Sequence, residues 1–556
     1  MATVTLPAGA GRPSPRGRLH DGGDAAVALT RQRLRERLGL PHPDPAWWAW
    51  VVAGVVGALA GVLRFVHLGR PPVLVFDETY YVKQAYSLLL YGHERDVVTS
   101  PTPVPEGASD TYANDRFESG SLDVFLDTPD FVVHPPLGKW MIAAGMQLDP
   151  DDAFFWRLSA AVVGTLSVGL LVLVGRRLLG STLLGGVAGL LLAVDGHHIV
   201  QSRTSLLDIF LSFWVLVAFA FLLADRFAAR ELLAERVARA LHAGTVSTYG
   251  PGLGLRPYRL LAGLSLGAGC ATKWSGLYVL AAFGLLTVLW DLDARRTAGV
   301  RHWFVGGLVR DSPVAFLATV PVAFAVYLLS WTGWFLADDS YNRTWAQENP
   351  DQAVSWLPQS LASLWEYHRS AYTFHTTINV VDNDHPYMAN PWSWLVQGRP
   401  TSFYYKGQDD GMTGCGADAC SSAVTSLGNP VVWWGGTLAL LVVVLAWLLR
   451  RDWRAGAILV PLAACYLPWF AYQERTIFSF YAVAFVPFLV LGLTYALGMV
   501  LGSARASPER RLWGAVGAGA VVVAAVGCLL FFYPVWTAQI MTTEAWRLRM
   551  WWPSWV

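Results

Sequence analysis

Long apolar runs dominate this sequence and restrict its fold more than any other feature, because each is close to the length that crosses a bilayer as a helix, about 20 residues. Of the 556 residues, 54% are hydrophobic and only 15% are charged. A soluble domain cannot bury so much apolar side chain, so a cytosolic enzyme, a disordered chain and a secreted disulfide scaffold are excluded. We predict an all-α integral membrane protein with about 11 transmembrane helices, at residues 46–68, 154–175, 181–196, 205–224, 258–271, 275–291, 313–331, 431–449, 455–472, 476–500 and 513–534. The fifth and sixth runs could also form one interrupted segment.

Basic residues set the expected orientation. Most of the 41 Lys and Arg residues fall on one side of this arrangement, together with the N-terminal tail. Positive charge marks the cytoplasmic side, so we expect a multi-pass plasma-membrane protein with its N-terminus in the cytoplasm. The predicted organisation is a disordered cytoplasmic tail (1–45), an N-terminal transmembrane catalytic module (46–331) with an extracytoplasmic loop (69–153), a large extracytoplasmic loop (332–430), a C-terminal four-helix transmembrane module (431–534) and an extracytoplasmic interfacial tail (535–556).

The two longest loops hold the unusual polar residues. Loops of this length usually carry function, and both are extracytoplasmic in the predicted topology. The first begins with the acidic pair Asp77 and Glu78 and ends with a histidine motif, HPPLGK at 134–139. The second contains Cys415 and Cys420, which an oxidising compartment would allow to form a disulfide, unless the loop geometry forbids it. The His and Asp side chains between 368 and 385 could hold a divalent cation, but their irregular spacing does not indicate one and fits hydrogen bonding better, so no cofactor is predicted.

Several cations are placed where a phosphate group could meet them. The chain has only four lysines, Lys83, Lys139, Lys273 and Lys406, and all four lie on the predicted outer side. Arg64 and Arg157 lie within proposed spans, near their outer ends, and Asp208 begins the fourth span. Charges at that depth are expensive unless they face a partner or a water-filled cavity. The alternative is that the long arginine stems carry their charged heads to the interface.

Asp77 and Glu78 are adjacent, so on a helix they point about 100° apart and two separate roles fit better than a shared proton. Asp77 could cap the helix that follows it, and this position would also expose it to a substrate.

The outer face of a membrane has no nucleotide supply, so a transferase there must take its activated group from a lipid carrier. Cations would bind the lipid phosphate, and a carboxylate would remove the acceptor's proton.

These motifs occur in an order that resembles the bacterial protein O-mannosyltransferases, the dolichyl- or polyprenyl-phosphate-mannose–protein mannosyltransferase family of the GT-C fold. The resemblance covers nearly the whole chain from Trp47 onwards. It rests on Arg64, FDE at 76–78, HPPLGK at 134–139, RLSA at 157–160, LLD at 206–208, TKWSGL at 272–277, and the loop pattern FH at 374–375, HPY at 385–387 and PWSW at 391–394.

The resemblance implies an inverting transfer of one mannose from polyprenyl-phosphate mannose to Ser or Thr hydroxyls of secreted proteins. Asp77 would be the catalytic base, and Glu78 would position the acceptor or its loop. Arg64, Arg157, Lys139 and Lys273 would bind the donor phosphate, and His134, Asp208, His375 and His385 would contact the substrates. Some relatives insert a β-rich sugar-binding module between the seventh and eighth spans. The present chain has no room for it there, so a partner such as the secretion channel would help to present the acceptor.

Two other functions remain open from the sequence. A GT-C transferase could use a lipid-linked sugar to modify a glycolipid or cell-wall glycan, and only the histidine motifs favour a protein acceptor. A secondary transporter would also have many spans and buried charges, but transporters tend to show internal repeats and helices interrupted at mid-membrane. No repeat is evident here, and the charges gather at one surface. A nucleic-acid partner is not expected, because the net charge is only +1.

Overall fold

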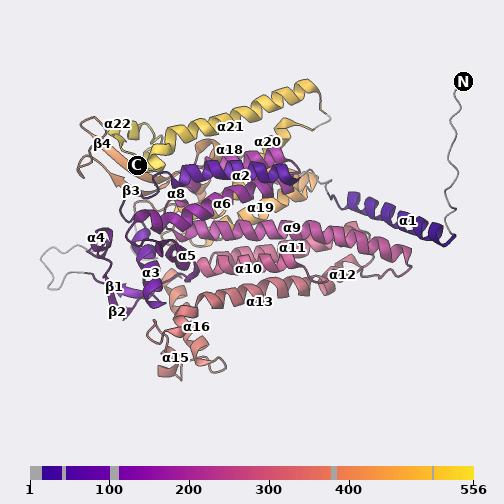
Figure 1. The fold of residues 1–556 in the computed structure, drawn as a ribbon, viewed down its shortest axis with the longest axis horizontal. Helices are drawn as coiled ribbons and strands as arrows, with labels where there is room; N and C mark the ends of the chain where they lie inside the picture. Colours follow the sequence, from indigo (N-terminus) through magenta and orange to yellow (C-terminus); the bar gives the residue numbers. More distant parts are fainter. Residues whose placement is uncertain (1–14, 41–45, 100–111, 377–384, 504–505) are drawn as a thin grey trace, which may run out of the picture. The chain divides into compact units, whose positions relative to one another are not determined.

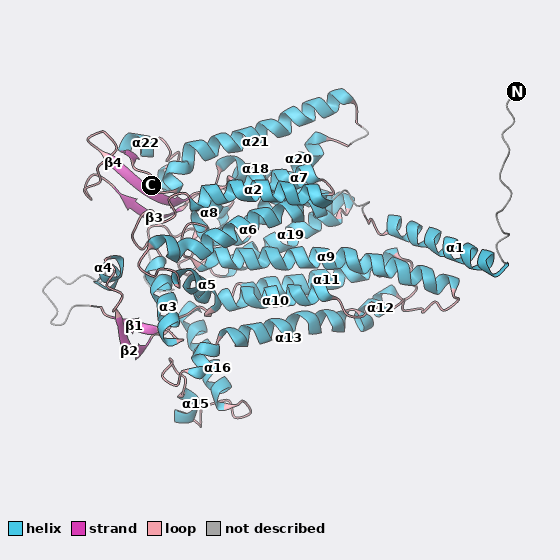
Figure 2. Cartoon of the chain, viewed as in Figure 1, coloured by secondary structure: helices cyan, strands magenta, loops and turns pink. Residues whose placement is uncertain are grey.

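The computed structural model describes residues 15–40, 46–99, 112–376, 385–503 and 506–556. Helices make up most of these residues, and the few strands form short sheets (Figure 2). The chain forms two compact units. Unit 1 contains residues 1–44, 224–259 and 284–318, and unit 2 contains residues 45–223, 260–283 and 319–556. The predicted modules followed the order of the sequence, whereas these units do not, because long helices contribute their two halves to different units.

In unit 1 the N-terminal region forms a helix, which corrects the prediction of a disordered tail for these residues. Helix α1 (Pro15–Arg37) is followed by Leu38, and both Leu34 and Leu38 are buried against Leu233 and Val237. This apolar contact gives the helix a tertiary partner, which a short isolated helix needs in water. The other elements of unit 1 are the second half of α9 (Leu207–His242), the end of α11 (Gly276–Thr297), α12 (Trp303–Arg310) and the start of α13 (Ser312–Ser330).

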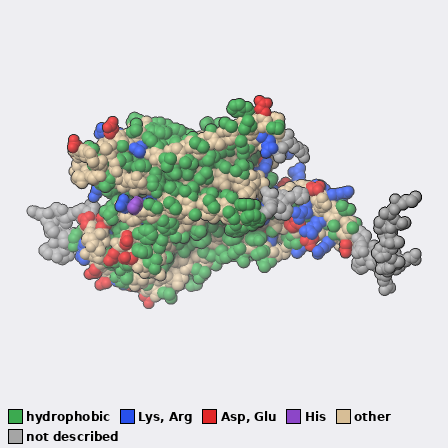
Figure 3. All heavy atoms as spheres, turned by 45° about the horizontal axis from the view of Figure 1, so that its top comes forward, with side chains coloured by type: hydrophobic (Ala, Val, Ile, Leu, Met, Phe, Trp, Pro, Cys, Tyr) green, Lys and Arg blue, Asp and Glu red, His purple; other side chains and the backbone are tan. Residues whose placement is uncertain are grey.

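Unit 2 is built on packed apolar helices. Helices α2 (Ala46–Phe65), α6 (Ala153–Leu179) and α7 (Thr182–Ala193) pack on one another, and α18 (Pro430–Arg450) packs on α20 (Val486–Leu501), as Figure 1 shows. On the face of unit 2 that carries α21 (Pro508–Trp536), hydrophobic side chains cover most of the surface (Figure 3). Such an apolar surface is suited to contact with lipid tails.

The remaining helices of unit 2 are mostly short. They are α3 (Glu78–Tyr91), α4 (Tyr112–Glu118), α5 (Leu137–Met146), α8 (Gly196–Gln201), α10 (Pro257–Thr272), α14 (Thr332–Leu336), α15 (Trp345–Glu348), α16 (Gln359–Thr376), α17 (Pro391–Trp394), α19 (Trp453–Tyr466) and α22 (Thr543–Arg547), with 3-10 turns at Leu467–Ala471, Ser479–Ala484 and Pro553–Trp555. Strand β1 (Arg95–Val97) pairs antiparallel with β2 (Phe125–Pro129). A three-stranded antiparallel sheet has the order β3 (Thr401–Lys406), β4 (Cys420–Ser426) and β5 (Met541–Thr542).

The chain is a multi-pass membrane protein, but the predicted count of 11 spans is not confirmed. Among the described residues, eight helices are long and apolar enough to cross a membrane, and Thr182–Ala193 and Val486–Leu501 are shorter apolar helices. The predicted span at 476–500 is wrong in its first part: residues Ser479–Ala484 form a 3-10 turn, and Pro487 stands in the first turn of α20, a position that suits proline because it needs no N–H partner. Helices α10 and α11 are separate, and the break between them contains Lys273.

Candidate active site

The adjacent acids Asp77 and Glu78 have different surroundings. The Glu78 side chain is fully buried and forms a two-pronged ion pair with Arg157, with Oε1–Nε and Oε2–Nη2 distances of 2.8 Å and 2.7 Å. Its carboxylate also accepts the backbone N–H groups of Val75 and Ser205. These four bonds hold the start of α3 in place. This geometry suits the positioning role that the sequence predicts for Glu78, because its carboxylate is engaged in holding the loop that carries Asp77.

Asp77 has the properties of a general base. It stands at the N-cap position of α3, but its side chain makes no capping hydrogen bond, so the capping role is not used. The preceding residue, Phe76, has a φ of 49°, a left-handed conformation that is rare for a bulky side chain. Burial raises the pKa of Asp77 to about 7, with Lys273 lowering it and Asp208 raising it. A carboxylate with a pKa near the working pH is well suited to proton abstraction.

Lys273 links this acid to a neighbouring cavity. Its ammonium lies 2.9 Å from both carboxylate oxygens of Asp208 and 4.1 Å above the centre of the Tyr481 ring. A side chain at Gly138 would meet Leu207 at 2.7 Å and Thr272 at 3.0 Å, and these two residues directly precede Asp208 and Lys273. Glycine at 138 therefore allows α5 to approach both segments, which brings three of the sequence motifs together.

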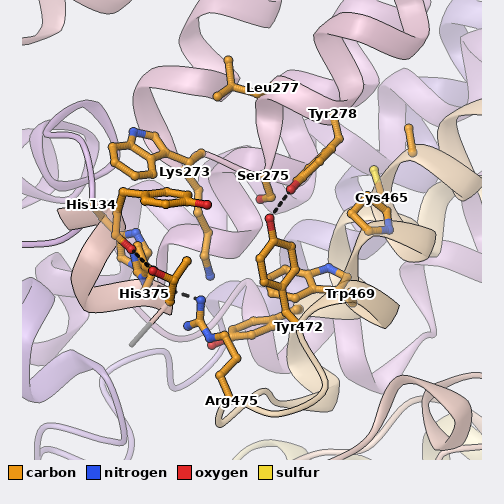
Figure 4. Close-up of a pocket in the computed structure, with 16 residues that line it drawn as sticks. His134, Lys273, Ser275, Leu277, Tyr278, His375, Cys465, Trp469, Tyr472 and Arg475 are labelled. Carbon is orange, nitrogen blue, oxygen red and sulfur yellow. Dashed lines mark hydrogen bonds between the residues drawn. The ribbon is translucent and has the colours of Figure 1, made fainter. Parts of the chain in front are cut away.

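The cavity has a volume of about 290 Å³. Lys273, His134, His375, Arg475 and Tyr481 line it, together with aromatic side chains, and Figure 4 shows Lys273 and Arg475 pointing into the same region. The His375 ring accepts a hydrogen bond from Arg475 at 3.4 Å, because its other nitrogen donates to the carbonyl of Val133 at 3.3 Å. Burial and the nearby Arg475 lower the pKa of His375 to about 4. The imidazole is therefore neutral at pH 7 and orients the Arg475 guanidinium toward the cavity.

A second, larger cavity shares part of this wall. It has a volume of about 580 Å³, and apolar and aromatic side chains line nearly all of it. Trp274, Leu277 and Tyr372 line both cavities. The Trp274 indole donates to the Tyr327 hydroxyl at 3.0 Å, and Tyr327 in turn donates to His368 at 2.5 Å. Trp274 is thus held in one orientation between a charged cavity and an apolar one.

Three of the four predicted phosphate ligands, Arg64, Arg157 and Lys139, are not among the side chains that line the cavity. All five N–H groups of Arg157 are bonded to Glu78 and to backbone carbonyls. Arg64 is fully buried and contacts His198 at 2.8 Å and helix carbonyls. Lys139 is also fully buried, paired with Glu94 and bonded to the carbonyl of His134. These side chains brace the structure, and of the four predicted ligands only Lys273 lines the cavity.

The other predicted substrate-binding residues lie in or near the cavity that Lys273 and Arg475 line. His134 lines the cavity 5.4 Å from His375, measured between ring centres, and burial lowers its pKa well below the usual value. His385 contacts Phe76, beside Asp77, and is not among the side chains that line the cavity. Cys415 and Cys420 form the expected disulfide. Asp382 and Asp384, which belong to the irregularly spaced His and Asp set between 368 and 385, lie outside the described residues.

Comparison with known sequences shows the family to which the chain belongs. A polyprenol-phosphate-mannose–protein mannosyltransferase of Mycolicibacterium smegmatis is 37% identical over 522 residues, covering 91% of this chain and 93% of its own length. The chain belongs to the protein O-mannosyltransferase family. The corresponding Mycobacterium tuberculosis protein is 35% identical over 515 residues, covering 91% of this chain and 92% of its own length. Family models described as "dolichyl-phosphate-mannose-protein mannosyltransferase" and "C-terminal four TMM region of protein-O-mannosyltransferase" match residues 133–241 and 360–555.

A solved structure confirms the fold class of this O-mannosyltransferase family member. The Saccharomyces cerevisiae protein O-mannosyltransferase Pmt1-Pmt2 complex bound to the sugar donor superposes with a TM-score of 0.64 at 15% identity, covering 96% of this chain and 94% of the yeast chain. At this identity the likeness concerns the fold alone. It agrees with the expected GT-C architecture, and the family membership confirms the resemblance found in the sequence.

The sequence motifs missed two groups of this O-mannosyltransferase site, Arg475 and Tyr481. Both lie between α19 and α20. The predicted spans at 455–472 and 476–500 left Arg475 in a short gap and placed Tyr481 inside the tenth span. A charged Glu474 and Arg475 pair interrupting two apolar runs was the signal that could have identified Arg475, because charge next to a span favours a polar cavity.

Proposed function

We propose that this chain transfers a single mannose from a polyprenyl-phosphate mannose to Ser or Thr hydroxyls of proteins. The observation that carries the proposal is Asp77, a carboxylate whose pKa is raised to about 7 and which interacts electrostatically with Lys273, a residue that lines the cationic cavity. The names of the M. smegmatis and M. tuberculosis relatives supply the donor and acceptor classes. The adjoining apolar cavity supports a lipid-linked donor, since it suits a hydrocarbon chain.

The reaction is a single displacement with inversion. The acceptor oxygen forms a bond to the anomeric carbon of mannose, and the bond from that carbon to the phosphate oxygen breaks. Asp77 takes the hydroxyl proton, and polyprenyl phosphate leaves with the electron pair. Lys273 and Arg475 stabilise the negative charge that develops on the departing phosphate, as cations fixed in a partly dry site do most effectively.

The proposed location is the plasma membrane, with the N-terminus in the cytoplasm and the active site outside. The distribution of basic residues supports this orientation. Acceptor hydroxyls are then reached as proteins leave the cell, before folding hides them. Association with the secretion channel would give the enzyme this access.

A transfer assay tests the proposal. Membranes containing the full chain are incubated with radiolabelled polyprenyl-phosphate mannose and a Thr-rich peptide, in parallel with Asp77→Asn, which keeps the shape of the side chain but removes the base. We expect label on the peptide with wild type and a loss of at least about a hundredfold with the variant. Equal labelling by Asp77→Asn would remove Asp77 from the mechanism. Label confined to a glycolipid would show a transferase of different acceptor class.

A further inference from the structure

A separate polar pocket lies along helix α3, beyond the Asp77 end. It has a volume of about 210 Å³, and its walls include Tyr80, Lys83 and Gln84 of α3, Asn114 of α4, Asp130, and residues 97–99 at the end of β1. None of these residues lines the cationic or the apolar cavity. The mechanism proposed above uses none of them.

Among the residues that the structure describes, hydrogen-bonding capacity remains open in this pocket. Lys83 is bonded to Asn114, and the Gln84 amide donates to one oxygen of Asp130 at 3.2 Å. An ammonium has three donors and a carboxylate has two acceptor oxygens, so Lys83 and Asp130 can each bind a further group. Burial lowers the pKa of Lys83 to about 8 and raises that of Asp130 to about 6. Both groups are incompletely solvated, and a small polar ligand would satisfy them better than the present surroundings.

The pocket also offers an exposed ring and a sheet edge. The Tyr80 side chain is 62% exposed. Strand β1 pairs only with β2 among the residues that the structure describes, so its second edge has no neighbouring strand there. An extended peptide recognises such an edge through its backbone and uses adjacent pockets for alternate side chains.

The distance from Asp77 fits an extended polypeptide. Tyr80 is three residues after Asp77, and Gln84 is seven residues after it. At a rise of 1.5 Å per residue, these side chains start about 4.5 Å and about 10 Å further along the helix axis than Asp77. An extended chain rises about 3.3 Å per residue. A peptide with one hydroxyl at Asp77 would therefore place a side chain two or three residues away over this pocket.

We propose that this pocket is an acceptor subsite, which binds a small uncharged polar side chain, a hydroxyl or an amide, two or three residues from the hydroxyl that receives mannose. The inference rests on the proposed function. It assigns Tyr80 and Gln84 to the recognition of the acceptor, next to the residue that receives mannose.

Isosteric peptides test the subsite in membranes containing the full chain. Each peptide carries one acceptor Thr in an Ala-rich background, with either Thr or Val two or three residues away, on each side in turn. With wild type, one placement of Thr should lower the peptide KM about three- to tenfold relative to Val, the effect of one hydrogen bond. Gln84→Ala should abolish this difference, and Tyr80→Ala should raise the KM of every peptide. The donor KM should stay unchanged in both variants.

The matched control is Trp356→Ala, an aromatic side chain that is 81% exposed and contributes to none of the three pockets. Binding of a fluorescent Thr peptide to the purified protein gives a second readout that needs no turnover, and it should weaken by the same factor. The subsite is overturned if wild type transfers mannose while Tyr80→Ala and Gln84→Ala keep the wild-type peptide KM and preference. Absence of transfer by wild type to every peptide would instead overturn the proposed function, and the subsite with it.

Discussion

Replacement of Glu78 by Gln tests whether this acid braces the site or acts in the chemistry. Glu78 and Arg157 are both fully buried, and Glu78 accepts two N–H bonds from Arg157 and two from the backbone. The Gln amide cannot accept at its nitrogen, so at least one donor loses its partner, and the Arg157 charge becomes unpaired. Removing one partner of a buried ion pair costs about 3–5 kcal/mol, which is about two to four orders of magnitude in the folding equilibrium.

Thermal unfolding in detergent micelles, followed by tryptophan fluorescence, measures this loss. We expect a clearly lower midpoint for Glu78→Gln, and partial recovery when Arg157→Met removes the unpaired charge in the same chain. The control is Asp127→Asn, because Asp127 pairs with Arg95 at the surface and exposed pairs contribute little. Its midpoint should stay at the wild-type value.

Activity at a temperature where every variant is folded completes the test. As a brace, Glu78 should affect the rate only through the position of Asp77, and the double variant should regain transfer along with stability. A normal unfolding midpoint combined with a transfer rate as low as that of Asp77→Asn would refute the reasoning and place Glu78 in the chemical step.

Three further outcomes follow from the geometry. Because the pKa of Asp77 is raised to about 7, its carboxyl holds a proton below that pH, so kcat/KM for the peptide should fall about tenfold per pH unit below 7 and level off above it; a flat profile between pH 5 and 8 would contradict this. Arg475→Ala should raise the donor KM about ten- to hundredfold through loss of a charge-assisted bond, and His375→Ala less, because the guanidinium remains; an unchanged donor KM in Arg475→Ala would exclude it from phosphate binding. Replacing Cys415 and Cys420 by Ser opens a loop of sequence separation 5 and should cost about 2 kcal/mol, seen as a lower unfolding midpoint with unchanged donor KM; an equal midpoint would show that the bond adds no stability.

Local patterns were sufficient to predict most of the apolar helices and the family. Apolar runs are a one-dimensional signal, since a helix in a membrane satisfies its own backbone. The exceptions are segments whose ends depend on other parts of the chain. Helix α1 is ordered where it packs on Leu233 and Val237, and the start of the predicted tenth span becomes a 3-10 turn. Neither outcome can be read from the segment itself.

The candidate site was predicted in part. The motifs containing Asp77, His134, Asp208, Lys273 and His375 were chosen from the sequence, and the structure brings these residues to one region. The sequence could not predict which cations remain available to a ligand. That property depends on how many of their N–H groups are already bonded by carboxylates and carbonyls from distant segments.

The number of N–H groups that are already bonded decides which cations can bind a phosphate and which only support the structure. A guanidinium that is fully buried must have nearly all its donors bonded, because an unpaired buried charge is costly, and Arg157 meets that condition without any ligand. Such a group cannot bind a phosphate without first releasing Glu78 or one of the carbonyls of Leu68, Pro71 and Val73, all of which belong to the segment that leads into Asp77 and α3. Phosphate binding by Arg157 would therefore disturb the segment that holds the base. Lys273 and Arg475 avoid this conflict, since they face the cavity and are held by Asp208 and by the neutral His375. The two adjacent acids thus separate support from chemistry: one fixes the helix start through a saturated arginine, and the other is left without a cap beside the cations that can still take a ligand.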